Sequence, residues 1–461
     1  MSETTVYQPD FLYRAGRFHE GATLQVGADG RVLPDGPVPP GARLVRWAGR
    51  ALLPGLVNAH SHAFQRLIRG RTEYVAEGRG SDDFWSWREA MYRAAEALTP
   101  EEVYTASRQA FLEMVLAGIT SVGEFHYLHH QSDGSPYGER NRLAHEVIHA
   151  ARDVGLRIVL LRVGYARAGF RVPENPRQRR FIDPDVDSFL SSVEELVRHT
   201  QGQPGVSVGL APHSVRAVPR EWLTVLAGVR SQLPVHMHVA EQPKELEACM
   251  AEHGLRPVEL LGELGLLSPR FTAVHAVHVT EAEARRMGEG GVSVCACPST
   301  ERNLGDGIVP ADLLAGAGTR LCLGSDSQAT VDLLDEARQL EGHLRLARLR
   351  RAVLDPGRGT VDGLAARLFE MATVNGARSL GLSTGSLEPG TPADFFTVDV
   401  EHPSLVGADA ASLLSGLVFG AEKAAVREVA VDGRLVVQGG HHPATQESGR
   451  AFQALARRLY S

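Results

Sequence analysis

Eight short apolar segments, each followed by a stretch with helical spacing, succeed one another through the middle of the chain. They cover residues 55–60, 119–125, 156–163, 206–212, 234–240, 271–276, 291–297 and 319–325. Alternating strand and helix patterns predict right-handed βαβ units that share one parallel sheet. Eight such units favour a closed (β/α)₈ barrel of the TIM type with insertions. An open doubly wound sheet is the alternative, although no G-x-G-x-x-G follows the first segment.

Both ends of the chain have the alternation and turn residues of short β-strands. Residues 22–26 and 31–33 flank the turn dipeptide Asp29-Gly30, and residues 426–431 and 435–437 flank Asp432-Gly433. Residues 393–398 form a further strand pattern, and residues 447–459 have helical spacing. We therefore expect a small β-sandwich domain made of residues 1–53 and 381–461, beside a barrel of residues 54–380.

Composition narrows the class of protein. The chain has 461 residues, too many for one simple core, and its 43% hydrophobic and 22% charged residues are typical of globular proteins. A formal charge of -7 argues against a nucleic-acid or membrane-surface partner. An acidic start, no apolar run of membrane-spanning length and four cysteines without a C-x-x-C pattern favour a reducing cytoplasm. The cysteines are Cys249, Cys295, Cys297 and Cys322.

Histidines and acids gather where the predicted barrel strands end, which is where barrels carry their catalytic groups. His60 and His62 share one face of the first strand, His238 ends the fifth, and Asp326 ends the eighth. Three histidines and one aspartate suit a single divalent metal such as Zn²⁺, with a coordination position left for water. His275, at the end of the sixth strand, belongs to the same region.

Each candidate also has an ordinary structural interpretation. Taken alone, His275 could be a hydrogen-bonded core histidine and Asp326 a helix N-cap. His236 competes with His238, but His238 is nearer the strand end, so we expect His236 inside the barrel. The H-E-x-x-H pattern at 145–149 matches a metalloprotease motif, yet it lies in a helix of the outer ring, where a chance match is expected. We expect loop positions or strand packing for His129, His130, His441, His442, Cys295 and Cys297.

Several motifs together resemble a known family. The segment 54–62 (PGLVNAHSH), His238-x-x-Glu241, His275 and Ser325-Asp326 resemble the aminohydrolase branch of the amidohydrolase superfamily. Segments 60–66, 84–92, 123–137 and 211–216 look like the formimidoylglutamate deiminase family within that branch. The resemblance covers nearly the whole chain, although segment 74–81 looks longer than the family pattern.

The resemblance implies hydrolysis of N-formimino-L-glutamate to N-formyl-L-glutamate and ammonia, a step of histidine degradation. Because no lysine precedes Lys244, the carboxylated lysine that bridges two metals in many relatives cannot form, and one metal ion is expected. Asp326 would accept a proton from the attacking water, His275 would hold the resulting hydroxide, and Glu241 would protonate the departing nitrogen. The residues expected to bind this small dicarboxylate are Gln65, Arg88, Tyr127, His213 and Arg216.

Two other functions stay open at this point. A deaminase of guanine or a related heterocycle would use stacking groups and amide donors rather than two arginines. A non-catalytic scaffold of the superfamily would have lost metal ligands, which this chain retains. The sequence does not determine the oligomeric state, although the exposed surface of a barrel is compatible with a homodimer.

Overall fold

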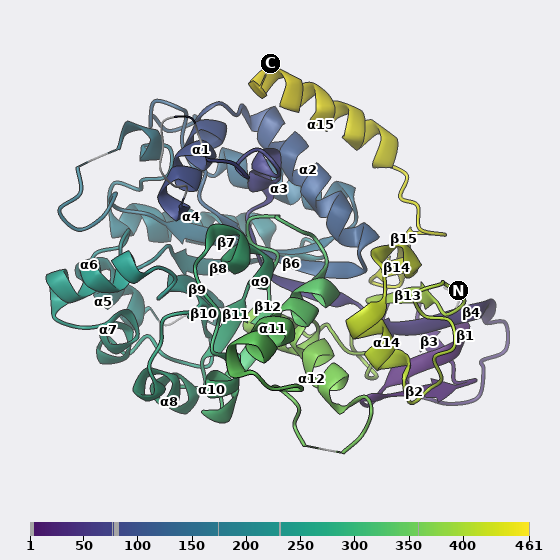
Figure 1. The fold of residues 1–461 in the computed structure, drawn as a ribbon. Coiled ribbons are helices and arrows are strands. Elements are labelled where there is room, and N and C mark those ends of the chain that lie inside the picture. The colour runs from purple at the N-terminus through teal and green to yellow at the C-terminus, as the bar shows by residue number, and fades with distance from the viewer. Residues whose placement is uncertain are drawn as a thin grey trace.

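A computed structural model describes residues 4–75, 77, 83–173, 175–229, 232–357 and 359–460. Most of segment 74–81, whose length departs from the family pattern, lies outside the described residues. The described part contains an eight-stranded parallel sheet surrounded by helices and a second, seven-stranded sheet beside it (Figure 1). Among the described residues, no helix combines the length and the apolar character needed to cross a bilayer.

The eight predicted barrel strands are all confirmed, and each pairs in parallel with its neighbour in chain order. Closure comes from the strand ends that carry the candidate site, where Asp326 N donates to His60 O at 3.0 Å and His62 N donates to Asp326 O at 3.0 Å. The sheet therefore forms a barrel rather than an open doubly wound sheet. Its strands are β5 (Leu56–Ser61), β6 (Ile119–His126), β7 (Arg157–Gly164), β8 (Val206–Pro212), β9 (Val235–Val239), β10 (Phe271–His275), β11 (Ser293–Ala296) and β12 (Arg320–Leu323).

Helices surround the barrel strands (Figure 1). The first three connections are long, and they carry the short helices η1 (Ala63–Ile68) and η2 (Pro176–Gln178) beside longer ones. The longer helices are α1 (Phe84–Glu96), α2 (Pro100–Leu116), α3 (Arg142–Asp153), α4 (Val186–Thr200), α5 (Arg220–Gly228), α6 (Pro243–His253), α7 (Pro257–Glu263), α8 (Glu281–Glu289), α9 (Pro298–Leu304), α10 (Ala311–Gly316), α11 (Leu333–Arg348), α12 (Gly363–Met371) and α13 (Val374–Ser379).

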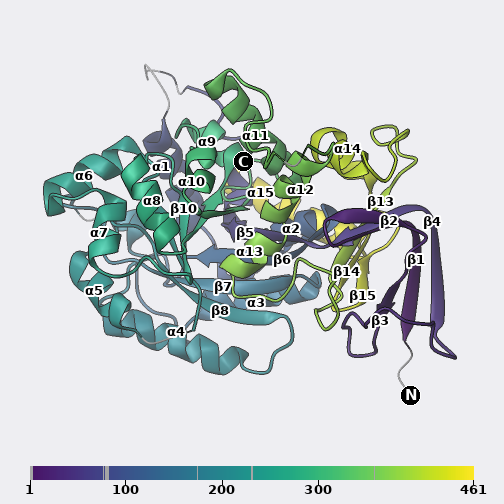
Figure 2. The same ribbon diagram turned by 90° about the horizontal axis from the view of Figure 1, so that it is seen from below.

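Strands from both chain ends form the second sheet, in the order β15-β14-β13-β4-β1-β2 with β3 paired to β1 (Figure 2). The central strand β4 pairs in parallel with β1 and antiparallel with β13, so distant parts of the chain meet on it. The seven strands form one hydrogen-bonded sheet. They are β1 (Thr5–Arg14), β2 (Arg17–Glu20), β3 (Leu24–Val26), β4 (Arg43–Pro54), β13 (Phe395–Asp399), β14 (Val426–Val431) and β15 (Arg434–Val437).

Short covalent and ionic connections fix the second sheet to the barrel. Only Gly55 separates β4 from β5. At the start of β7, the Arg157 guanidinium donates to Asp394 at 3.1 Å and to Asp432 at 2.7 Å, and the side chain of Asp394 is fully buried. A buried carboxylate is costly without a cationic partner, so separating Arg157 from Asp394 would be unfavourable. The contact therefore stabilises the packing of the second sheet against the barrel.

The C-terminal segment does not stay with the second sheet. After α14 (Leu413–Gly420) and η3 (Lys423–Ala425), the chain ends in α15 (Thr445–Tyr460), which lies along α2 of the barrel (Figure 1). Arg108 of α2 donates to Glu447 at 3.0 Å, and Ser448 donates to Gln109 at 3.0 Å. The division into residues 1–53 with 381–461 and residues 54–380 stays a prediction.

Candidate active site

Four buried donor groups converge at the end of the barrel where the strands terminate. The Nε2 atoms of His60 and His62 lie 3.2 Å apart, and they lie 3.4 and 3.2 Å from Asp326 Oδ1. The donor atoms of these three residues and of His238 all lie within 4.8 Å of one another. Ligand atoms about 2.0–2.1 Å from one ion in a tetrahedron lie about 3.3–3.4 Å apart, so the spacing fits a single metal ion.

Hydrogen bonds orient two of the imidazoles for metal binding. His62 Nδ1 donates to Phe125 O at 3.0 Å, and His238 Nδ1 donates to His213 O at 3.1 Å. With the proton on Nδ1, the Nε2 lone pair of each ring is available to a metal. Burial lowers the pKa of His60 to about 3 and, together with His60, holds the pKa of His238 well below its ordinary value. Neutral imidazoles facing one carboxylate form a suitable donor set for Zn²⁺ or a similar cation.

A second group of charged residues lies beside the donors. His275 Nε2 lies 3.6 Å from Glu241 Oε1 and 3.7 Å from Asp326 Oδ2, so it separates the two carboxylates. On the other side of the ring, Nδ1 lies 3.2 Å from Glu301 Oε1. Although burial disfavours the imidazolium, Glu241, Glu301 and Asp326 raise the pKa of His275 to about 10. The Nε2–H of His275 can therefore donate a hydrogen bond to a group that lies between the carboxylates of Glu241 and Asp326.

The backbone is strained where these residues leave their strands. His275, Ala276 and Asp326 have φ values of 70°, 51° and 44°, and Ala240, next to Glu241, has φ 53°. A non-glycine residue in this left-handed region costs about 1–3 kcal/mol and persists only where its surroundings hold it. The strain therefore coincides with the side chains that carry the candidate chemistry.

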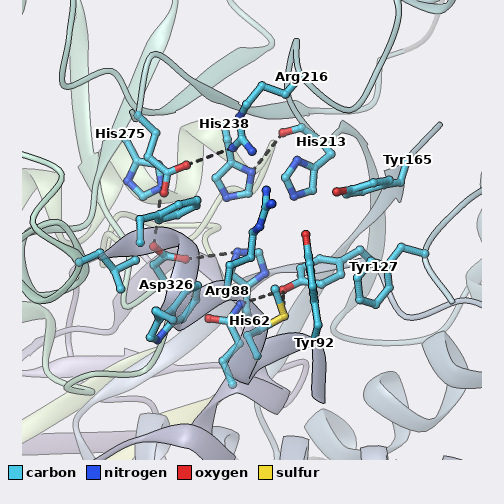
Figure 3. A pocket seen from close by; sticks show the side chains of 17 residues that line it. His62, Arg88, Tyr92, Tyr127, Tyr165, His213, Arg216, His238, His275 and Asp326 are labelled. Atoms are coloured by element: carbon cyan, nitrogen blue, oxygen red, sulfur yellow. Dashed lines mark hydrogen bonds and ion pairs between the residues drawn. The ribbon is translucent and has the colours of Figure 1, made fainter. Parts of the chain in front are cut away.

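One cavity connects the donor cluster with the wall formed by α1 and the loops after β7 and β8 (Figure 3). All five predicted substrate-binding residues line it, together with Glu241, His275 and Asp326. The wall also has an apolar part, which sequence reasoning did not assign to the site. The lining residues are His62, Gln65, Phe84, Trp87, Arg88, Met91, Tyr92, Tyr127, Tyr165, Phe181, His213, Arg216, His238, Glu241, His275, Leu304 and Asp326.

The two arginines of the cavity differ in their surroundings. Arg216 NH2 lies 3.4 Å from Glu241 Oε2, so its charge already has an acid partner. Arg88 stacks 4.4 Å from the Trp85 ring and 5.4 Å from the Tyr92 ring, and its Nε is buried without a hydrogen-bond partner. Among the residues that the structure describes, Arg88 forms no ion pair with a carboxylate. It points into the cavity in Figure 3, as a binding group for an anion would.

Comparison with known proteins places this site in a family. The profile of the amidohydrolase family matches residues 51–436. The chain belongs to the amidohydrolase family.

Relatives of this amidohydrolase match it over almost its full length. A formimidoylglutamate deiminase of Pseudomonas aeruginosa is 40% identical over 93% of this chain and 94% of its own. A crystal structure of an amidohydrolase from Brucella melitensis has a TM-score of 0.91 and 36% identity, over 99% and 100% of the two chains. A zinc-bound adenosine deaminase from Xanthomonas campestris has a TM-score of 0.82 and 26% identity, over 99% and 97%. Amidohydrolases depend on metal, and the donor cluster of this one agrees with that property.

His236, His129, His130 and the histidines of the H-E-x-x-H pattern are not part of the donor cluster of this amidohydrolase. His236 is fully buried, and its Nε2 donates to Ser379 O at 2.9 Å. The H-E-x-x-H pattern lies on α3 of the outer ring, where the His145 ring is 4.2 Å from the His199 ring of α4. His129 and His130 follow β6 in a loop and donate to backbone carbonyls. Three buried cysteines pack together inside the barrel, namely Cys295, Cys297 and Cys322.

Sequence reasoning missed the buried glutamates that support the amidohydrolase site. Glu124 accepts from Ser61 Oγ at 2.6 Å and from Ala63 N at 2.7 Å, next to the ligand candidates of β5. Glu301 accepts from Cys297 N at 2.8 Å as well as contacting His275. The available signal was an acid on or just after a barrel strand, but such acids usually lie in solvent.

Proposed function

We propose that this amidohydrolase hydrolyses N-formimino-L-glutamate to N-formyl-L-glutamate and ammonia, a step of histidine degradation. The observation that carries the proposal is that the donor cluster and Arg88, a cation without an acid partner among the described residues, open into one cavity. The substrate has two carboxylates and an amidine carbon, so it requires both features together. The 40% identity to a formimidoylglutamate deiminase supports the same conclusion.

The proposed cofactor is one Zn²⁺ ion held by His60, His62, His238 and Asp326. Three neutral imidazoles and one carboxylate are a usual donor set for catalytic zinc. Such an ion supplies Lewis-acid activation of water at neutral pH.

We also propose a cytoplasmic enzyme, because its four cysteines are all unpaired and buried. A homodimer is the oligomeric state to test by size-exclusion chromatography.

The chain's own residues move the protons of the proposed reaction. Asp326 takes up a proton from the attacking water at Oδ2, which faces His275. His275 Nε2 donates a hydrogen bond to the attacking oxygen and so holds it beside the amidine carbon. Glu241, which lies near the same Nε2 atom, gives a proton to the departing nitrogen. Ammonia leaves, the hydroxyl of the tetrahedral adduct gives its proton to the Glu241 carboxylate, and the product keeps the formyl oxygen that came from water.

The wall of the cavity binds the rest of the substrate. Arg88 and Arg216 take the carboxylates, because a guanidinium matches the planar carboxylate with two hydrogen bonds. Gln65 Nε2 donates to the Tyr127 hydroxyl at 2.8 Å, which leaves Gln65 Oε1 free to accept from the substrate. Burial and then Arg216 hold the pKa of His213 well below its ordinary value, so it contributes as a neutral ring near the reacting end.

The direct test is a comparison of substrates with the purified, metal-analysed enzyme. We expect about one zinc ion per chain and rapid ammonia release from N-formimino-L-glutamate. Guanine is the competitor substrate, because the aromatic side chains of the cavity would also suit a flat heterocycle. Faster ammonia release from guanine would assign the site to the heterocycle deaminases, and absence of both metal and hydrolysis would indicate a scaffold.

A further inference from the structure

Glu245 is a buried acid in the first turn of α6, immediately beyond the segment that carries Glu241. Its exposed fraction is 0%. Its two carboxylate oxygens accept from two consecutive backbone groups, Ala240 N at 3.1 Å and Glu241 N at 3.3 Å. A carboxylate removed from water is costly unless it is paired and hydrogen-bonded, so these contacts explain how it is tolerated there.

The contacts of Glu245 fix the turn that aims Glu241 into the cavity. Ala240 has φ 53°, a left-handed conformation that an alanine adopts only when its surroundings hold it. Its N–H donates to Glu245, and its carbonyl accepts from His278 N at 3.0 Å. A glutamine at position 245 has one oxygen, so one of the two N–H groups would then face an amide donor. The turn would be held less firmly, although the side chain would keep its size.

The same carboxylate also contacts the cation next to Glu241. Arg216 Nε lies 3.8 Å from Glu245 Oε2, while Arg216 NH2 lies 3.4 Å from Glu241 Oε2. The Arg216 side chain is only 10% exposed, so it lies between two acids in a site with little water. Although burial disfavours its charge, Glu245 and Glu241 raise the pKa of Arg216. Glu245 therefore contacts two residues with different proposed tasks.

We propose that Glu245 is a positioning residue that holds Glu241 and Arg216 in the arrangement in which proton donor and substrate-binding cation act on one substrate molecule. Glu245 does not line the cavity, so it acts through these two residues rather than on the substrate. The inference rests on the proposed function for the tasks of Glu241 and Arg216. It goes beyond that function by naming the group on which their relative placement depends.

The first measurement compares Glu245→Gln with a matched variant of the same helix, Glu247→Gln, whose side chain is exposed. A displacement of about 1 Å in a catalytic group can cost about 10²-fold in rate. We therefore expect Glu245→Gln to lower kcat about 100-fold and to raise KM about tenfold, with unchanged metal content. Glu247→Gln should stay within threefold of the wild type in both constants. Wild-type constants for Glu245→Gln would overturn the proposal.

Double variants separate positioning from a general loss of stability. If Glu245 affects kcat through Glu241, the double variant Glu241→Gln with Glu245→Gln should have a kcat less than threefold below that of Glu241→Gln alone. If Glu245 affects KM through Arg216, the double variant Arg216→Met with Glu245→Gln should have a KM less than threefold above that of Arg216→Met alone. Full multiplication of the separate losses would overturn the proposal, because independent effects combine in that way. Should Glu245→Gln fail to fold, Glu245→Asp replaces it in both cycles with the same expectations.

A structural comparison distinguishes this inference from the proposed function. Absence of ammonia release from N-formimino-L-glutamate by the wild type would refute the proposed function alone. Crystal structures of the wild type and of Glu245→Gln still test the positioning role, whatever the substrate. We expect the Ala240–Glu241 turn and the Arg216 guanidinium to move together in the variant. Unchanged positions of both groups would overturn the inference.

Discussion

Replacement of Arg88 by methionine tests the assignment of the substrate's carboxylates. Methionine keeps an unbranched side chain against the Trp85 and Tyr92 rings, so the change removes mainly the charge and its donors. Truncating one partner of a desolvated, hydrogen-bonded charge pair costs about 2–5 kcal/mol. Because Arg88 is only half-buried, we expect about 2–4 kcal/mol. This corresponds to a loss of about 30- to 1,000-fold in kcat/KM.

The loss should appear mainly in KM, because Arg88 belongs to the wall of the cavity rather than to the proton-transfer groups. The assay is ammonia release from N-formimino-L-glutamate and from two analogues that each lack one carboxylate. With the analogue that lacks the carboxylate bound by Arg88, Arg88→Met should cost less than threefold. Arg93→Met, an exposed position of the same helix, is the matched control. An equal loss with all three substrates, or no loss, would refute the assignment.

Three further predictions concern the metal, the contact between the sheets and a buried acid. Removal of the metal by a chelator should abolish activity and lower the Tm, and zinc should restore both; a metal-free enzyme with full activity would contradict the donor assignment. Arg157→Met should lower the free energy of unfolding by about 3–5 kcal/mol in denaturant titrations, because it leaves Asp394 buried without its cation, and adding Asp394→Asn should recover part of the loss. Burial raises the pKa of Glu336 from 4.5 to about 8, so the folded state keeps a proton that the unfolded chain has lost between these values. The unfolding free energy should therefore fall with rising pH in this window, by up to about 1.4 kcal/mol per pH unit. Glu336→Gln should remove that part of the slope, and an identical slope in both proteins would show that Glu336 is ionised throughout.

The barrel could be predicted because its strands are short continuous apolar runs between helical patterns. Three strands of the second sheet, β1, β2 and β4, were missed, and for β4 and β1 the sequence shows a physical reason. In β4, Arg43, Arg46 and Arg50 interrupt the apolar residues at irregular spacing, and the first eight residues are exposed or half-buried, so the segment lacks the regular alternation that predicts a strand. In β1, Pro9 lies within the strand, and the register shifts between Pro9 and Phe11. The hydrophobic pattern is therefore most informative where a strand is fully buried, as in the barrel.

The convergence of the donor residues could be predicted from the sequence, whereas part of the cavity wall could not. The carboxyl ends of all barrel strands lie at the same end of the barrel, so residues placed there by the sequence pattern are expected to converge. This reasoning identified His60, His62, His238 and Asp326, whose donor atoms do lie together. Tyr165 and Phe181 enter the cavity wall from the loop after β7, whose path depends on tertiary packing. Nothing in their sequence surroundings distinguishes them from core aromatic residues.

The position of β4 at the centre of the second sheet has a consequence for biosynthesis. One edge of β4 pairs with β13, as in the contact between Leu53 and Phe396, so that edge has no partner while the intervening chain is still on the ribosome. Every donor of the metal cluster, up to Asp326, emerges before β13 begins at Phe395. The four donor residues are therefore synthesised while this strand edge is still open to association with other chains. Release of the polypeptide before residue 395 would leave that edge of β4 without its native partner.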